Sequence, residues 1–232
     1  MTDTPPPDAP HRAIRSFVKR TGRMTSAQSR ALEELWPRYG VDYAGQRLNL
    51  DALFGRQAPR SFEIGFGDGE SLVALAAAEP DRDFIGVEVH TPGVGHCLLA
   101  AVAAQLANLR VLQHDAVEVL EQSIAPGSLD EVLIYFADPW PKKRHHKRRI
   151  VQTAFASLLA SRIAPNGRLR LATDWLPYAE WMRDVLDAHP DFHNAAGDAG
   201  YVPRPRARPV TKFERRGTRL GHEVRDLEYV RT

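Results

Sequence analysis

Short apolar segments alternate with helical patterns from residue 61 onward, and this alternation restricts the fold more than any other feature of the chain. Strands are expected at residues 61–66, 83–89, 110–113, 131–136 and 168–172. Five of the six residues in 131–136 are large and apolar, which is typical of a central strand buried on both faces. The alternation predicts an α/β fold with a doubly wound, mostly parallel sheet and right-handed crossovers.

The intervening helices follow from apolar spacing and from proline positions. Helices are expected at residues 70–79, 92–106 and 117–122, the second of them with Pro92 at its first helical position. Two more follow from apolar residues on one helical face: Val151, Phe155, Leu158, Leu159 and Ile163, then Tyr178, Trp181, Met182, Val185 and Leu186. We expect Asn166–Gly167 to end the first of these two helices. Residues 212–230 are expected to supply the last two strands.

The chain before the sheet has its own helix signal. Thr25 and Gln28 have the spacing of a capping box, so we expect a helix there that Pro37 ends. Residues 1–10 contain four prolines and two acids, which predicts a disordered tail. The chain therefore divides into a tail (1–10), a basic and helical extension (11–55) and one α/β domain (56–232).

Cysteine and histidine positions bear on compartment and on metal binding. Cys97 is the only cysteine, which excludes an intramolecular disulfide and a thiolate metal cluster. His145–His146 has no partner at ligand spacing, and Pro190 disrupts a helical pair of His189 and His193, so no metal is expected. Because no segment has the roughly 18 apolar residues of a membrane span, and no secretion leader is evident, we expect a cytoplasmic protein without membrane contact.

Basic residues are clustered, although the net charge is only +2. His11–Arg30 holds six Lys or Arg and no acid, Lys142–Arg149 reads KKRHHKRR, and Arg204–Arg219 holds seven Lys or Arg and one acid. Each block alone is equally well explained as a solvated loop. Three such blocks in one short chain favour contacts with nucleic-acid phosphates.

The segment Glu63–Gly69, EIGFGDG, lies where the first expected strand turns into a helix. Its glycines allow a tight turn and a close approach of a ligand to the backbone, although a tight turn alone would explain them. The spacing G-x-G-x-G differs from the G-x-G-x-x-G of dinucleotide sites. Glu63 would disfavour a pyrophosphate and suits the ammonium of a methionine moiety, so the loop favours S-adenosylmethionine over NAD.

Two further acids stand at strand ends. Glu88 ends the second expected strand, where a carboxylate can accept hydrogen bonds from ribose hydroxyls. Asp115 follows the third, where it can accept from an adenine amino group. Glu63 or Asp115 alone is equally well explained as a helix cap or a surface acid. The three acids together with the glycine loop favour a cofactor site.

The fourth expected strand leads into Asp138-Pro139-Trp140-Pro141, directly before the densest basic block. The prolines stiffen this turn, and Asp138 can accept from guanine N1–H and the N2 amino group. Trp140 is interpreted either as a ring that stacks on a base or as packing beneath the loop. Asp174 follows the fifth strand, where it is either a site residue or a helix N-cap.

These segments resemble the bacterial tRNA (guanine-N7-)-methyltransferases. The similarity runs from about residue 15 to the C-terminus and is carried by EIGFGDG, VEVHTPGVG, FADPWPKKRHHKRRI, ATDWLPYAEW and TKFERRG. The third and fifth segments are the most specific, whereas many methyltransferases share the glycine loop. The resemblance implies a Rossmann-like, seven-stranded fold of class I S-adenosylmethionine-dependent methyltransferases. It also implies methyl transfer to N7 of guanosine 46 in the tRNA variable loop.

The resemblance implies residue roles position by position. The cofactor would be bound by Glu63, Gly65, Gly67, Gly69, Glu88, Asp115 and Asp138, the last also being the catalytic residue. The substrate would contact Lys142, Asp174, Thr211, Lys212, Phe213 and Glu214. The RNA would contact Arg144, His145, His146, Lys147, Arg148 and Arg149. Asp68 occupies a position that varies in the family, and no role is assigned to it.

Guanine chemistry indicates a mechanism based on positioning. N7 already carries an in-plane lone pair, so no general base is needed before attack on the sulfonium methyl. Positive charge develops on the ring during transfer, and Asp138, helped by Asp174, would stabilise it from the Watson–Crick edge.

Three alternatives remain at this level. Asp-Pro-Trp-Pro distantly resembles the Asp-Pro-Pro-aromatic motif of methyltransferases that act on exocyclic amines of DNA. A catalytically silent RNA-binding module is disfavoured by the full set of acids, and an NAD oxidoreductase fits least.

The oligomeric state is also suggested by the resemblance. VEVHTPGVG resembles the monomeric branch of the family, so a monomer is expected.

Overall fold

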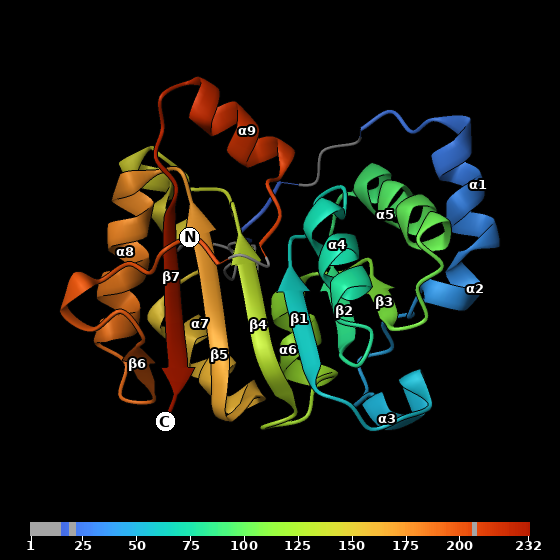
Figure 1. Cartoon of the computed structure of the whole chain (residues 1–232), viewed down its shortest axis with the longest axis horizontal. Coiled ribbons are helices and arrows are strands. Elements are labelled where there is room, and N and C mark those ends of the chain that lie inside the picture. The colour runs from blue at the N-terminus through green and yellow to red at the C-terminus, as the bar shows by residue number, and fades with distance from the viewer. Residues whose placement is uncertain (1–14, 19–21, 206–207) are drawn as a thin grey trace, which may run out of the picture.

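The computed structural model describes residues 15–18, 22–205 and 208–232, and the expected tail at 1–10 lies outside the described residues. One seven-stranded sheet runs through the centre in the order β3-β2-β1-β4-β5-β7-β6 (Figure 1). The strands are β1 (Arg60–Ile64), β2 (Asp83–Val87), β3 (Leu109–Leu112), β4 (Leu129–Tyr135), β5 (Ile163–Thr173), β6 (Phe192–Asn194) and β7 (Arg225–Arg231). Strands β1 to β5 are parallel and β7 is antiparallel, which confirms the doubly wound fold with β4 inside it.

Helices cover both faces of the sheet (Figure 1). One face is covered by α1 (Ser26–Glu34), α2 (Trp36–Tyr39), α4 (Glu70–Ala78) and α5 (Thr91–Ala103), and the other by α6 (Ala116–Gln122), α7 (Thr153–Arg162) and α8 (Leu176–Asp187). The remaining elements are α3 (Leu50–Phe54), α9 (Lys212–Arg219) and the short 3-10 helices η1 (Lys143–Arg148) and η2 (Gly197–Ala199). Among the described residues, no helix is long and apolar enough to span a membrane.

The N-terminal extension packs on the sheet domain through α1 and α2. The capping box is confirmed, because Thr25 N donates to Gln28 Oε1 at 2.9 Å and Gln28 N donates to Thr25 Oγ1 at 3.2 Å. Helix α1 stops at Glu34, and Pro37 lies in the first turn of α2. Pro37 therefore begins the second helix instead of ending the first, as its fixed φ and missing N–H allow. The boundary between residues 55 and 56 stays a prediction.

The expected helix end at Asn166–Gly167 is wrong. Helix α7 already ends at Arg162, and β5 begins at Ile163. Asn166 has φ +64°, and the pairing of β4 with β5 shifts register at this point. The two residues therefore form an irregularity within the strand, because Asn and Gly accept left-handed backbone in either setting.

The expectation of two strands within residues 212–230 is half wrong. Residues 225–231 form β7, but Lys212–Arg219 is helix α9, and the other edge strand is β6. Thr211 caps α9 by accepting a hydrogen bond from Glu214 N at 3.3 Å. This spacing is the same Thr-x-x-acid or amide pattern that predicted α1, and it was the available signal for α9.

Candidate active site

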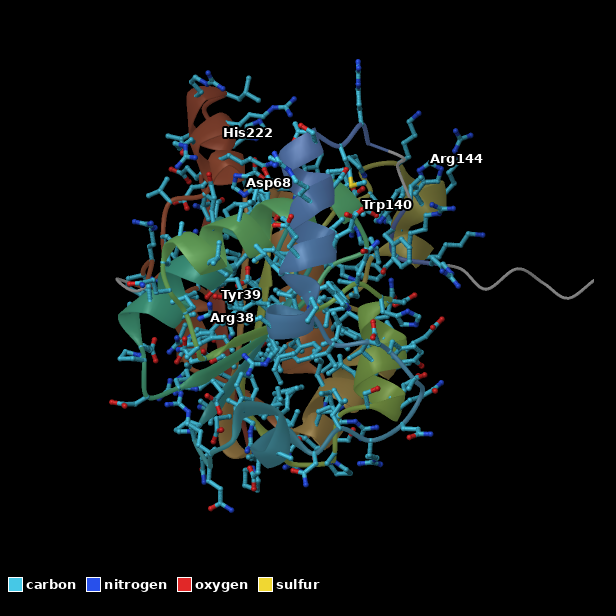
Figure 2. The ribbon with its side chains drawn as sticks, turned by 90° about the vertical axis from the view of Figure 1, so that its right-hand side faces the viewer. Arg38, Tyr39, Asp68, Trp140, Arg144 and His222 are labelled. Atoms are coloured by element: carbon cyan, nitrogen blue, oxygen red, sulfur yellow. The ribbon has the colours of Figure 1, made fainter. Side chains whose placement is uncertain are left out.

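The predicted site residues gather at the carboxyl ends of the parallel strands. Figure 2 shows Asp68, Trp140, Arg144 and His222 at this end of the molecule, while Arg38 and Tyr39 lie farther down. Helix α9 stands above the same edge in Figure 1. In open α/β sheets this edge is where ligands bind.

Glu63 in β1 is a buried acid with an unsatisfied oxygen. Its side chain is 2% exposed, and Oε2 has no hydrogen-bond partner within the described structure. Burial raises the pKa of Glu63 to about 8. A buried, unpaired carboxylate is costly unless a cation or a donor completes it. Glu63 therefore fits the ammonium group of an amino-acid ligand.

The glycine turn after β1 depends on glycine for conformation and for space. Gly69 has φ +81°, and a Cβ there would lie 2.6 Å from Cys97 Sγ in α5. Gly65 has φ +69°, but a Cβ there would meet no atom within 4 Å. Packing therefore fixes the turn at Gly69, while the backbone at Gly65 is left open to a ligand.

Glu88 connects the second strand to the glycine turn. Its Oε2 accepts from Gly67 N at 2.8 Å, and its Oε1 accepts from the N–H groups of Val89 at 2.6 Å and His90 at 2.9 Å. Asp115 caps α6 by accepting from Val117 N at 3.0 Å. Each carboxylate keeps further acceptor capacity, so these local roles leave room for ligand contacts.

Asp138 lies on a strained turn after β4. Phe136 has φ +54° and Trp140 has φ +45°, a region in which bulky side chains are costly. Asp138 is exposed, and its Oδ1 accepts from Trp140 N at 3.2 Å. The half-buried Trp140 donates from Nε1 to Ser16 O at 2.9 Å, and the Arg148 guanidinium lies 4.8 Å from its ring centroid. Contacts of Trp140 therefore hold this turn and present the Asp138 carboxylate outward.

The basic block forms η1, and its side chains point in different directions. Arg144 and Lys147 are exposed, whereas Arg149 is only 3% exposed. Arg149 donates from Nε to Pro139 O at 3.0 Å and lies over the rings of Tyr178 and Trp181. The expected RNA contact of Arg149 therefore does not fit its burial, and Arg149 instead fastens the Asp138 turn to α8.

The two histidines of the block are half-buried. Desolvation and the neighbouring cations lower the pKa of His145, so its imidazole is neutral at pH 7. His146 lies against Trp181, and its Nε2 accepts a hydrogen bond from Arg149 Nη2 at 3.2 Å. The positive field of η1 therefore comes from its lysines and arginines.

Asp174 lies under α9. His222 Nδ1 is 3.2 Å from Asp174 Oδ2, and a Cβ at Gly217 would come within 2.4 Å of the same oxygen. The N-cap of α8 is Trp175, without a side-chain cap. The helix-cap interpretation of Asp174 is therefore wrong.

Glu214 is held inside the C-terminal segment. Arg208 is 1% exposed, donates to Glu214 Oε2 at 2.5 Å and donates to Asp226 Oδ1 at 2.7 Å. The same guanidinium lies 5.7 Å from the Phe136 ring centroid. Arg208 thus joins α9, β7 and the end of β4. The sequence did not predict this role, because Arg208 lies within a run of arginines.

The other predicted substrate residues of this segment lie at the start of α9. Thr211 caps α9, Lys212 pairs with Asp68, and the Phe213 side chain lies outside what the structure describes.

Comparison with known proteins agrees with this arrangement. Residues 57–227 match the family described as "Putative methyltransferase". A tRNA (guanine-N(7)-)-methyltransferase of Halorhodospira halophila is 59% identical over 94% of this chain and 95% of its own length. The chain belongs to the tRNA (guanine-N(7)-)-methyltransferase family.

Further relatives and one solved structure extend the match. The family member of Leifsonia xyli subsp. xyli is 59% identical over 93% of this chain and 94% of its own length. The crystal structure of the aminoglycoside resistance methyltransferase NpmB1 superposes with a TM-score of 0.54 at 16% identity, covering 81% of this chain and 95% of that one. At that identity the likeness to NpmB1 supports the fold alone.

Proposed function

We propose that this family member transfers the methyl group of S-adenosylmethionine to N7 of guanosine 46 in the variable loop of tRNA. The products are N7-methylguanosine in the RNA and S-adenosylhomocysteine. The observation that carries the proposal is the unsatisfied Glu63 carboxylate beside the glycine turn, on the same sheet edge as Asp138 and η1. The relatives' name supplies the nucleic acid and the guanine atom.

The residues of the glycine turn fit this cofactor. Glu63 would receive the ammonium group, Gly65 and Gly67 would face it with backbone, and Gly69 keeps the turn closed against α5. Glu88 and Asp115 offer acceptors for ribose hydroxyls and for an adenine amino group. The cofactor, when bound, supplies an electrophilic methyl group on a sulfonium.

Asp138 is the proposed catalytic residue. Its exposed carboxylate can accept from guanine N1–H and the N2 amino group, and this contact strengthens as the ring gains positive charge. The guanine N7 lone pair needs no deprotonation, so Asp138 orients the base and stabilises charge without acting as a general base. Asp174, beneath α9, is proposed to assist from the fifth strand.

The proposed substrate contacts lie on both sides of Asp138. Lys142, Arg144, Lys147 and Arg148 would bind RNA phosphates, with Arg149 holding their turn. Thr211, Lys212, Phe213 and Glu214 would contact the nucleotide from the other side. We also propose that the protein acts in the cytoplasm as a monomer.

The test is transfer of a labelled methyl group from S-adenosylmethionine to tRNA that lacks N7-methylguanosine, followed by digestion and nucleoside identification. N7-methylguanosine confined to the variable loop is the expected product. A tRNA with adenosine in place of guanosine 46 is the matched control and should take no label. Label in a different nucleoside would overturn the guanine-N7 assignment, and label in DNA would overturn the RNA assignment.

A further inference from the structure

Two acids of the cofactor loop contact the segment proposed to hold the guanine. Lys212 Nζ pairs with Asp68 Oδ2, and Lys212 N donates to Glu70 Oε2 at 2.7 Å. Arg215 Nη2 donates to Glu70 Oε1 at 3.0 Å. Asp68 and Glu70 flank Gly69, and Lys212 and Arg215 are three residues apart, so both cations lie on one face of α9. We call these contacts the charged latch.

The charged latch is built from partly exposed groups. The side chains of Lys212 and Asp68 are 44% and 31% exposed, and those of Arg215 and Glu70 are 56% and 36% exposed. Neither hydrophobic core includes a side chain of α9 among the described residues. Exposed ion pairs each change an equilibrium constant by up to about fivefold, so the latch is strong enough to bias the position of α9 and weak enough to open.

The opposite side of α9 is attached differently. Glu214 is buried against Arg208, which is in turn held by Asp226 of β7. Helix α9 is therefore held by a buried ionic contact on the β7 side and by weaker, partly exposed ion pairs on the side of the glycine turn. The second anchor joins the first turn of α9 directly to the cofactor loop, through Lys212 and Arg215.

We propose that Asp68 and Glu70 are positioning residues for the substrate, which dock α9 on the cofactor loop through Lys212 and Arg215. The docked helix holds residues 211–214 at a fixed distance from the glycine turn, so the guanine and the methyl donor are brought into register. This inference rests on the proposed function in assigning guanine contacts to residues 211–214. It gives Asp68, whose position in the loop had no assigned role, a function of its own.

The variant Glu70→Arg distinguishes docking of α9 on the cofactor loop from general attraction of RNA by the net charge of the protein. A protein that binds RNA only through net charge would bind it more tightly after this change, because two units of positive charge are added. The charged latch predicts the reverse, since Lys212 N and Arg215 lose their acceptor. We expect kcat/KM for tRNA to fall about fivefold to tenfold, while the Kd for S-adenosylmethionine stays within about twofold.

Matched variants control for charge and for folding. Asp81→Arg makes the same charge change in the exposed turn between α4 and β2, away from α9, and should not lower kcat/KM. Arg215→Glu should impair activity more than Arg219→Glu, because Arg215 pairs with Glu70 whereas Arg219 forms no ion pair with any described residue. The swap Glu70→Arg with Arg215→Glu should restore part of the lost activity, because it rebuilds the ion pair with position 215 but not the acceptor for Lys212 N. Glu70→Arg with Arg219→Glu should restore none of it. Glu70→Gln tests the same contacts without introducing an arginine that could disturb α4, and it should lower kcat/KM less than Glu70→Arg does.

Hydrogen exchange of the α9 amides in the RNA-free protein tests the charged latch independently of enzymatic activity. Exchange at residues 213–219 should accelerate in Glu70→Arg and return towards the wild-type rate in the swap. The inference is overturned if Glu70→Arg matches Asp81→Arg in both exchange and kcat/KM. If the wild-type protein makes no N7-methylguanosine, the proposed function fails, and the exchange rates alone then decide whether the acids hold α9.

Discussion

The Arg208 guanidinium donates to the Glu214 carboxylate at 2.5 Å, and both side chains are buried. Asp226 of β7 completes the contact from the other side. Three charges therefore lie within the fold at the base of α9, and they stabilise it only while all are present. Desolvation opposes the charged form of Arg208, but hydrogen bonds and attraction to the two acids raise its pKa overall, so it stays charged.

Arg208→Met should lower the free energy of unfolding by about 3 kcal/mol, because it leaves two buried acids without their cation. Urea unfolding at neutral pH measures this change. Arg204 reaches Glu214 at 3.3 Å but is 41% exposed, so Arg204→Met is the matched control and should cost less than about 1 kcal/mol. Equal losses in the two variants would contradict the central role of Arg208.

Cofactor affinity should rise from about pH 6 to about pH 7.5, because burial raises the pKa of Glu63 to about 8 and the ammonium of the ligand requires the ionised form. Binding in this range should release a proton, which calorimetry in buffers of different ionisation enthalpy detects. Glu63→Gln should abolish the proton release and weaken binding about tenfold or more. Proton release that persists in Glu63→Gln would assign it to another group.

The same group makes stability depend on pH in the absence of ligand. Between about 4.5 and 8 the folded protein retains the Glu63 proton that the unfolded chain has released. Stability should therefore fall as pH rises through this window, and the Glu63→Gln variant should lose this part of the dependence. Thermal unfolding of both proteins at a series of pH values measures the difference.

Asp138→Asn should lower kcat for tRNA methylation about 100-fold, because the amide cannot match a carboxylate as partner for the developing charge. The amide oxygen can still accept from Trp140 N, so the turn is kept. Cofactor affinity, measured by calorimetry, should change little. Equal losses of turnover and of cofactor affinity would instead mean that Asp138 acts mainly through the cofactor contact that the family resemblance also implies for it.

Arg144→Ala with Lys147→Ala should weaken tRNA binding and reduce the slope of log Kd against log salt by about 1 to 2. Fluorescence anisotropy at several salt concentrations measures both quantities, and thermal unfolding should be unchanged. Arg149→Ala should show the opposite pattern, with a lower melting temperature, because Arg149 is buried against Pro139, Tyr178 and Trp181. A pure affinity loss in Arg149→Ala would mean that its side chain reaches the RNA.

The core of the fold was predictable because short segments with several large apolar residues alternate with helical patterns along the chain. β4 is the clearest case, as six of its seven residues are buried. The prediction failed in the C-terminal segment, where Lys212–Arg219 lacks an apolar stripe and is held by ion pairs. The capping pattern of Thr211 and Glu214 was the only local signal there, and a periodicity argument does not use it.

For the site, the sequence placed the acids at strand ends but not their partners. Asp68 and Lys212 are 144 residues apart, and nothing local links them. Arg149 and Arg208 both stand in basic blocks, yet both are buried. Composition indicates how much charge a segment carries, whereas the direction of each side chain follows from the tertiary packing.

The left-handed backbone at Phe136 and Trp140 has a consequence for how this protein can evolve. Each position costs about 1 to 3 kcal/mol relative to a glycine that would adopt the same angles freely. Glycine at either position would relieve this strain, so a selection for thermostable variants should favour Phe136→Gly and Trp140→Gly. Gains made there would be offset by a looser Asp138, so selection for heat resistance and selection for turnover pull this turn in opposite directions.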